Sequence, residues 1–198
     1  MFSNKFFVIL YFLIIFAQRK RTTLKTQNDM IHAQNGDPYN FSTKYEIDSY
    51  KIEYKDLHDI GKEGPLCGKL LINDQLCTND KLVNYEEYNG FGGPFLITNK
   101  YLYTTIWQWN NPHNFNDIIG ALVAEINLED LSIRLIGKKQ SYIHIVYIND
   151  NKIYYFDAYY NRNKLKSLDI NEDFKPRTFR DTLTDLYQDL KYIFFGVQ

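Results

Sequence analysis

The sequence predicts a mainly β protein: an antiparallel meander or sandwich of propeller-like hairpins that ends in one C-terminal amphipathic helix. Aromatic residues make up 17% of the 198 residues, with 17 tyrosines and 14 phenylalanines, and such residues favour half-buried sheets. Segments with alternating apolar and polar residues recur at about the 8–12 residue spacing of all-β domains. Near the C-terminus the apolar period changes to that of a helix.

Two tyrosine-rich copies of a strand-turn-strand unit suggest that the hairpins are propeller-like. One copy begins at 97–103 (ITNKYLY) and reaches a turn at 126–130, and the other begins at 148–155 (INDNKIYY) and reaches a turn at 170–173. A repeat of about 45 residues is the length of a propeller blade. Two copies are too few to close a propeller. The first copy is the longer one, and we interpret its polar segment 110–117 as an inserted loop.

Residues 1–29 differ in composition from the rest of the chain. An apolar run at 6–17 is followed by Arg19, Lys20 and Arg21. This run is shorter than the roughly 20 residues that cross a bilayer, so no stable membrane span is expected. Three interpretations remain open: a cleaved signal peptide, an uncleaved anchor, or a mis-assigned start with Met30 as the true one. The first is preferred and places the mature protein outside the cytoplasm, whereas a start at Met30 leaves it cytoplasmic.

Residues 30–44 are polar and rich in turn residues, which predicts a linker. A single β-rich domain is then expected over 45–198. Its first strand is predicted at 45–54, and a hairpin that turns at Asn73 and Asp74 is predicted from 66–72 and 75–77. The glycine-rich run 89–94 is interpreted as a structural turn. The other predicted strands cover 101–109, 122–126, 131–136, 142–148, 152–157 and 164–170.

The helix is predicted at about 181–195. Its apolar residues recur at helical spacing, and Thr178 with Asp181 matches a capping box. This apolar face is expected to pack on the sheet; it consists of Leu183, Leu186, Tyr187, Leu190, Ile193 and Phe194. The only two cysteines, Cys67 and Cys77, flank the predicted hairpin. They form either one bridge or two buried thiols, because direct pairing across that hairpin does not place them opposite each other.

No catalytic or metal-ligand pattern is recognisable. The four histidines, His32, His58, His113 and His144, lack ligand spacing. We therefore expect no enzymatic activity, no cofactor and no metal. The formal net charge is −1, without a dense basic stripe, which argues against nucleic acid as a partner.

Two surfaces are candidates for binding. Asp181, Asp185 and Asp189 recur every four residues and would form an acidic ridge on the helix, suited to a basic partner. Residues 1–29 hold five basic residues and one acidic residue, so from residue 30 onward 18 basic residues face 23 acidic ones and the charge is −5. The second candidate is an aromatic strand face, which is either core or a ligand surface: Tyr101, Tyr103, Trp107 and Trp109.

Four short segments carry a resemblance to a known class of proteins. They are GPLCGKLLIN at 64–73, GGPFL at 92–96, IGKK at 136–139 and NKIYY at 151–155. Together they resemble small β-rich immunity proteins of bacterial polymorphic-toxin and contact-dependent inhibition systems. The resemblance implies a protein that binds and blocks a cognate toxin domain without chemistry of its own. It assigns no binding residues.

The expected function is therefore that of a non-enzymatic binding protein, an immunity protein that occludes a cognate protein toxin through its acidic ridge. One alternative is an exported carbohydrate-binding module that uses the aromatic face. In that alternative, polar groups beyond the strand 152–157 would assist: Asp157, Tyr159, Tyr160 and Asn161. The other alternative is an enzyme of an unrecognised type.

Overall fold

A computed structural model describes residues 30–34, 36–60, 64–78, 89–108, 120–159, 162, 164–178, 180, 181, 183, 184, 186, 187 and 190. The chain divides into two compact units, residues 1–30 and 31–198. In the first unit only Met30 is described. No helix within the described residues is both long enough and apolar enough to cross a lipid bilayer.

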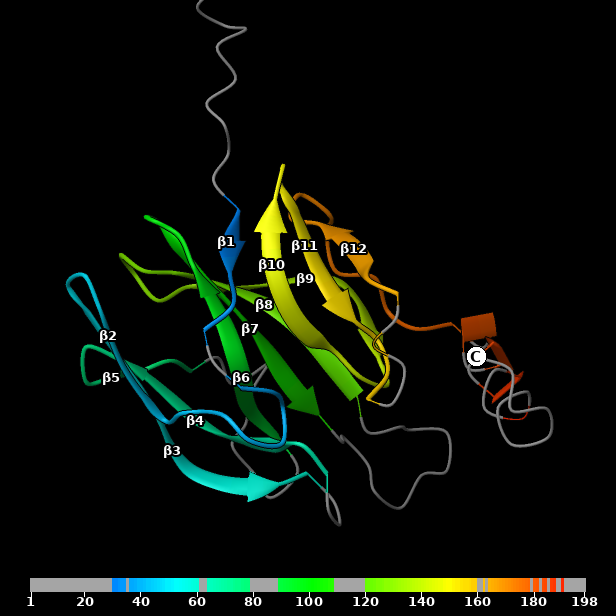
Figure 1. Ribbon diagram of the computed structural model, residues 1–198, viewed down its shortest axis with the longest axis horizontal. Coiled ribbons are helices and arrows are strands. Elements are labelled where there is room, and N and C mark those ends of the chain that lie inside the picture. Colours follow the sequence, from blue (N-terminus) through cyan, green and yellow to red (C-terminus); the bar gives the residue numbers. More distant parts are fainter. Residues whose placement is uncertain are drawn as a thin grey trace, which may run out of the picture. The chain divides into compact units, whose positions relative to one another are not determined.

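The described part of residues 31–198 contains two antiparallel sheets (Figure 1). The smaller has the order β1-β10-β11-β12, formed by Ile31–His32, His144–Asn149, Lys152–Phe156 and Lys166–Asp169. The larger has the order β2-β3-β4-β6-β7-β8-β9, with β5 paired to β4. Its strands are Lys44–Ile47, Tyr50–Asp59, Leu66–Ile72, Gln75–Leu76, Asn89–Ile97, Tyr101–Gln108, Gly120–Asn127 and Ile133–Gln140. The mainly β fold class is confirmed, whereas a propeller-like arrangement is not.

Strand β7 is buried on both faces because it separates two hydrophobic cores. Leu102 and Ile106 point into a core shared with β3 and β4, which requires the large sheet to curve over itself. Tyr103 and Trp107 point to the other side, into a core between the two sheets. Alternation along a strand sends successive side chains to opposite faces, so a run of six consecutive buried residues, 102–107, results here.

Strand positions follow the sequence closely where local turn chemistry is strong. Asn73 and Asp74 form the β4–β5 turn with φ of 50° and 63°, and Asp150 with Asn151 forms the β10–β11 turn with φ of 48° and 60°. Asparagine and aspartate tolerate this left-handed geometry, which tight hairpins require. The two tyrosine-rich units lie in different sheets, so they share turn chemistry rather than a common blade.

The prediction of one continuous strand at 45–54 is wrong. The structure divides it into β2 and β3, a hairpin with Ile47 opposite Tyr50. Asp48 supplies the turn with φ of 52°. The alternation of apolar residues shifts by one residue at this turn, from positions 45 and 47 to positions 50, 52 and 54, so the sequence does carry a signal of the break.

The interpretation of the glycine-rich run 89–94 as a turn is also wrong, because the run belongs to strand β6. Its glycines permit close packing: a Cβ on Gly90 would lie 2.6 Å from the backbone nitrogen of Gly68, and one on Gly92 would lie 2.5 Å from the Trp107 ring. Only a residue without a side chain fits at such distances. The run therefore allows β6 to lie close to its antiparallel neighbour β4 and leaves room for the Trp107 ring.

The prediction of a linker at 30–44 is wrong from residue 31 onward, because this segment is part of the folded structure. Ile31 and His32 pair with β10, and Phe41 is buried in the core beneath β3. Polar composition suggested a linker, but the few apolar residues of this segment are the ones that anchor it.

The two cysteines form no disulfide and are buried in different cores, Cys67 between the sheets and Cys77 beneath the curved sheet. Burial raises the pKa of each thiol to about 12, so both stay protonated at neutral pH. The sequence left open either one disulfide bridge or two buried thiols, and the structure has two buried thiols.

Candidate functional site

The segment after β12 fastens the small sheet to the outer strand of the large one. Asp173 forms an isolated backbone β-bridge with Ile136, and Lys175 forms one with Lys138; both partners are on β9. The Lys175 backbone amide donates to the Gly137 carbonyl over 2.8 Å. Gly137 has φ of 69° and contacts the Leu168 side chain, which leaves no room for a Cβ. The chain is thereby held along β9 up to the start of the C-terminal residues with helical backbone.

The predicted capping box at Thr178 and Asp181 is present. The Thr178 amide and hydroxyl each donate to the Asp181 carboxylate over 2.7 Å, and the Asp181 amide lies 3.4 Å from the Thr178 hydroxyl. Such reciprocal bonds satisfy amides that an α-helix leaves free at its first turn. The described residues that follow, Arg180, Asp181, Leu183, Thr184, Leu186, Tyr187 and Leu190, have helical backbone. The helix bounds at 181–195 stay a prediction.

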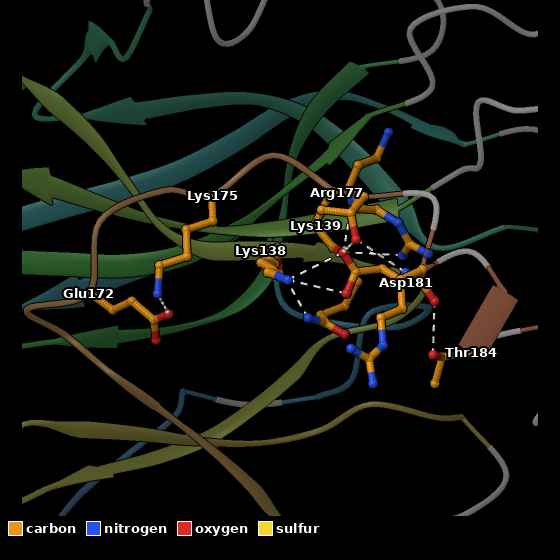
Figure 2. Close-up of polar contacts among 10 residues, drawn as sticks. Lys138, Lys139, Glu172, Lys175, Arg177, Asp181 and Thr184 are labelled. Atoms are coloured by element: carbon orange, nitrogen blue, oxygen red, sulfur yellow. Dashed lines mark hydrogen bonds and ion pairs between the residues drawn. The ribbon is translucent and has the colours of Figure 1, made fainter.

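Lys138 connects this cap to the large sheet (Figure 2). Its Nζ lies 3.2 Å from both oxygens of Asp181, while Arg177 donates to the Lys139 carbonyl over 3.3 Å. Hydrogen bonds from Thr178, followed by the contact with Lys138, hold the pKa of the Asp181 carboxyl well below its usual range. Asp181 therefore already has a cationic partner within the chain.

The three aspartates of the predicted ridge are thus not equivalent. Asp181 is tied to Thr178 and Lys138, whereas Asp185 and Asp189 lie outside the described residues. Their part in partner binding stays a prediction. The sequence alone could not show that Asp181 has a cationic partner, because Lys138 is 43 residues away along the chain.

The described apolar side chains of the same stretch are exposed rather than packed on a sheet, contrary to the prediction. Four of them are exposed, with relative accessibilities of 48%, 53%, 64% and 42% for Leu183, Leu186, Tyr187 and Leu190. Ile193 and Phe194 lie outside the described residues. Phe174, just before the cap, is also 44% exposed. The described C-terminal residues therefore present a row of large apolar groups to solvent.

Within the described residues, the aromatic strand face is core at Tyr103 and Trp107 rather than a ligand surface. Tyr103 and Trp107 are 2% and 1% exposed, and Tyr101 is half-buried with its ring 6.2 Å from that of Tyr103. Trp109 lies outside the described residues. The small sheet covers this face, so the carbohydrate-binding alternative loses the surface on which it depends.

A different aromatic cluster was missed by sequence reasoning. Tyr39, Tyr142 and Tyr159, named here the tyrosine triad, come from three distant segments, and their ring centroids lie 4.7 to 6.4 Å apart. Arg162 lies over the Tyr159 ring at 5.4 Å and is 3.5 Å from Asp37. Of these residues, only Tyr159 is a candidate from the sequence alone, and no spacing links the three segments.

Within the described residues, no group of three or more His, Cys, Asp or Glu side chains could hold a metal ion. Comparison with protein-family models, curated proteins and solved structures finds no significant match.

Proposed function

We propose that the protein is a non-enzymatic binding protein of the immunity type, and that its C-terminal helical residues contact the protein partner. The observation that carries this proposal is the exposure of Leu183, Leu186, Tyr187 and Leu190. Their spacing of three, one and three residues is that of the anchors by which an amphipathic helix enters an apolar groove on a partner. Contiguous exposed apolar groups of this size mark interaction surfaces.

The cap supports an orientation in which the apolar side chains of the helical residues face solvent. At about 100° per residue, all four apolar residues lie on roughly the opposite side of a regular helix from Asp181. Asp181 contacts Lys138 on β9. The apolar row is then turned away from that strand and toward solvent. Asp181 orients the helix, and the apolar row is the part offered to a partner.

The partner proposed is a cognate toxin domain with a basic surface. The charge of −5 from residue 30 onward favours encounter with such a domain and accelerates association at low salt. Asp185 and Asp189 remain the residues proposed to meet basic groups, whereas Asp181 is already paired within the chain.

Co-expression of the full chain with the product of the adjacent upstream gene, followed by calorimetric titration, tests the proposal. Leu186→Ala combined with Tyr187→Ala should weaken binding at least tenfold, because centrally placed anchors commonly contribute more than about 1.4 kcal/mol. Leu76→Ala, which truncates an exposed leucine on β5 at 43%, is the control and should leave the affinity unchanged. Equal affinities for all three proteins would exclude the helical residues as the contact, and the lack of any complex would exclude the immunity function.

The charge contribution is measured separately. Asp185→Asn combined with Asp189→Asn should slow association and reduce its dependence on salt. Binding that ignores both salt and these substitutions would remove the electrostatic part of the proposal and leave the apolar contact.

A further inference from the structure

The segment that leads from the small sheet to the C-terminal helical residues begins at a firm anchor. Arg134 on β9 donates to the Ile170 carbonyl over 2.6 Å, and it also donates over 2.9 Å to Glu125, which is 8% exposed. The Ile170 amide donates to the carbonyl of Asn151, at the β10–β11 turn, over 2.9 Å. Both sheets therefore hold the chain at residue 170. Residues 171–178, which follow this anchor, are named here the strap.

The strap contacts β9 at separate points rather than as a continuous strand. None of residues 171–178 is buried. The backbone β-bridges at Asp173 and Lys175 are isolated, one antiparallel and the other parallel. Pro176 has no amide hydrogen, so it cannot extend these bridges into a ladder. Because a segment with so little buried surface opens at a lower cost than the core, the strap can detach while both cores stay folded.

A bulge in β9 provides the docking site for the strap. Val123 of β8 lies opposite Ile136 and Ala121 lies opposite Gln140, so residues 137–139 face a single residue of β8. Extra residues in one strand turn part of its backbone out of the regular ladder. Here the carbonyls at positions 137 and 139 accept hydrogen bonds from the strap over 2.8 Å and 3.3 Å. The bulge thus holds the strap through its own backbone.

Lys138, in the middle of this bulge, fastens the far end of the strap (Figure 2). Its Nζ lies 3.2 Å from both carboxylate oxygens of Asp181, the capping residue just beyond the strap. The two side chains are 36% and 30% exposed. Partly exposed ion pairs contribute little stability and are screened by salt. The pair of Lys138 and Asp181, named here the latch, is therefore weak enough to open.

We propose that the strap docks on the β9 bulge and releases from it, and that this equilibrium regulates the contact between the apolar row and its protein partner. The inference rests on the proposed function. With the strap docked, the latch holds the cap against β9 and the apolar row is presented in one orientation. Release removes that orientation, and binding must then restore it, so the apparent affinity falls with the docked fraction. Lys138 is thus a positioning residue that acts through the strap.

The latch predicts an effect opposite in sign to that of the overall charge. Replacing Lys138 with glutamate makes the chain more acidic, which by long-range attraction alone would strengthen binding to a basic partner. The same substitution opens the latch, because two carboxylates then face each other, and this weakens binding. A matched change of charge elsewhere on the surface therefore separates the two effects.

Hydrogen-exchange mass spectrometry of the full chain, without a partner, tests the docking itself. In Lys138→Glu the strap amides should exchange about threefold faster or more, while the amides of β7 keep their rate. Lys138→Arg keeps a cation in place and should exchange like the natural chain. Lys69→Glu is the matched control, because Lys69 on β4 is 43% exposed and pairs with Asp56 on β3 over 2.6 Å. It should leave the strap unchanged.

Calorimetric titration with the product of the adjacent upstream gene measures the consequence for binding. The affinity of Lys138→Glu should be about threefold lower or more than that of Lys69→Glu, although both variants carry the same net charge. Lys138→Met should show a smaller effect in the same direction, and it replaces Lys138→Glu if that variant does not fold. Lys138→Arg should bind like the natural chain.

The two measurements fail in distinguishable ways. Unchanged exchange in both Lys138→Glu and Lys138→Met would overturn the docking of the strap. Faster exchange combined with equal affinities for Lys138→Glu and Lys69→Glu would overturn the regulation. The lack of any complex would remove the proposed function and the regulation with it, and the exchange rates, which need no partner, would still decide whether the strap docks.

Discussion

Strand β7 and the C-terminal helical residues both carry a strong apolar pattern, yet the protein uses them in opposite ways. In β7, Tyr103 and Trp107 enter one core while Leu102 and Ile106 enter the other. In the helical residues, Leu186 and Tyr187 are 53% and 64% exposed. A pattern shows which residues share a face, but it does not show whether anything covers that face. The substitutions below test this contrast.

The largest effect is expected for Trp107→Ala. Trp107 is 1% exposed, and removing a buried ring should lower the free energy of unfolding by about 3–5 kcal/mol. Urea denaturation followed by far-ultraviolet circular dichroism measures this loss. Tyr187→Ala is the aromatic control from the exposed region and should change stability little. A loss below about 1 kcal/mol for Trp107→Ala would mean that this ring is not core.

A smaller loss is expected for Gly92→Ala. The added Cβ would lie 2.5 Å from the Trp107 ring and 3.0 Å from the Thr105 hydroxyl, so Trp107 must move. Overpacking of this kind typically costs about 1–3 kcal/mol. Thermal denaturation compares it with the natural chain. If Gly92→Ala were as stable as the natural chain, the close approach of β6 and β7 would be in error.

A pH-dependent effect is expected at the cap. The pKa of Asp181 is lowered by Thr178 and Lys138, so the carboxylate stabilises the fold above its unfolded pKa of about 3.9, and this contribution is lost as the pH falls through the lower folded pKa. Asp181→Asn should therefore be less stable than the natural chain at pH 7, and the difference should shrink below about pH 3.9. Thr178→Ala should reduce the same pH dependence. Parallel stability curves for Asp181→Asn and the natural chain would contradict the assignment.

The smallest effect is expected for Leu186→Ala. Since Leu186 is 53% exposed, its truncation should stay within about 0.5 kcal/mol of the natural stability. Leu102→Ala is the matched substitution in β7, where the side chain is fully buried and the loss should reach about 2–5 kcal/mol. A loss above about 1 kcal/mol for Leu186→Ala would show that its face is covered within the protein.

Local sequence features predicted the structure where short-range chemistry decides it. The β4–β5 hairpin follows from Asn73 and Asp74, which accept the left-handed turn geometry. The capping box follows from a threonine and an aspartate three residues apart. Alternation placed the centres of most strands, and the single strand predicted over 45–54 overlooked the one-residue shift of the apolar pattern at Asp48 and Ser49.

Only the tertiary structure decided which of these faces are available for binding. Burial of Trp107, pairing of Asp181 with Lys138, and the meeting of Tyr39, Tyr142 and Tyr159 all join residues that are remote in sequence. Composition and period describe each segment by itself, whereas exposure and ion pairing depend on which other segment lies against it. The sequence alone therefore determined a mainly β chain with a capped C-terminal segment. The folded chain determined that its aromatic strand is core and that its C-terminal apolar residues are surface.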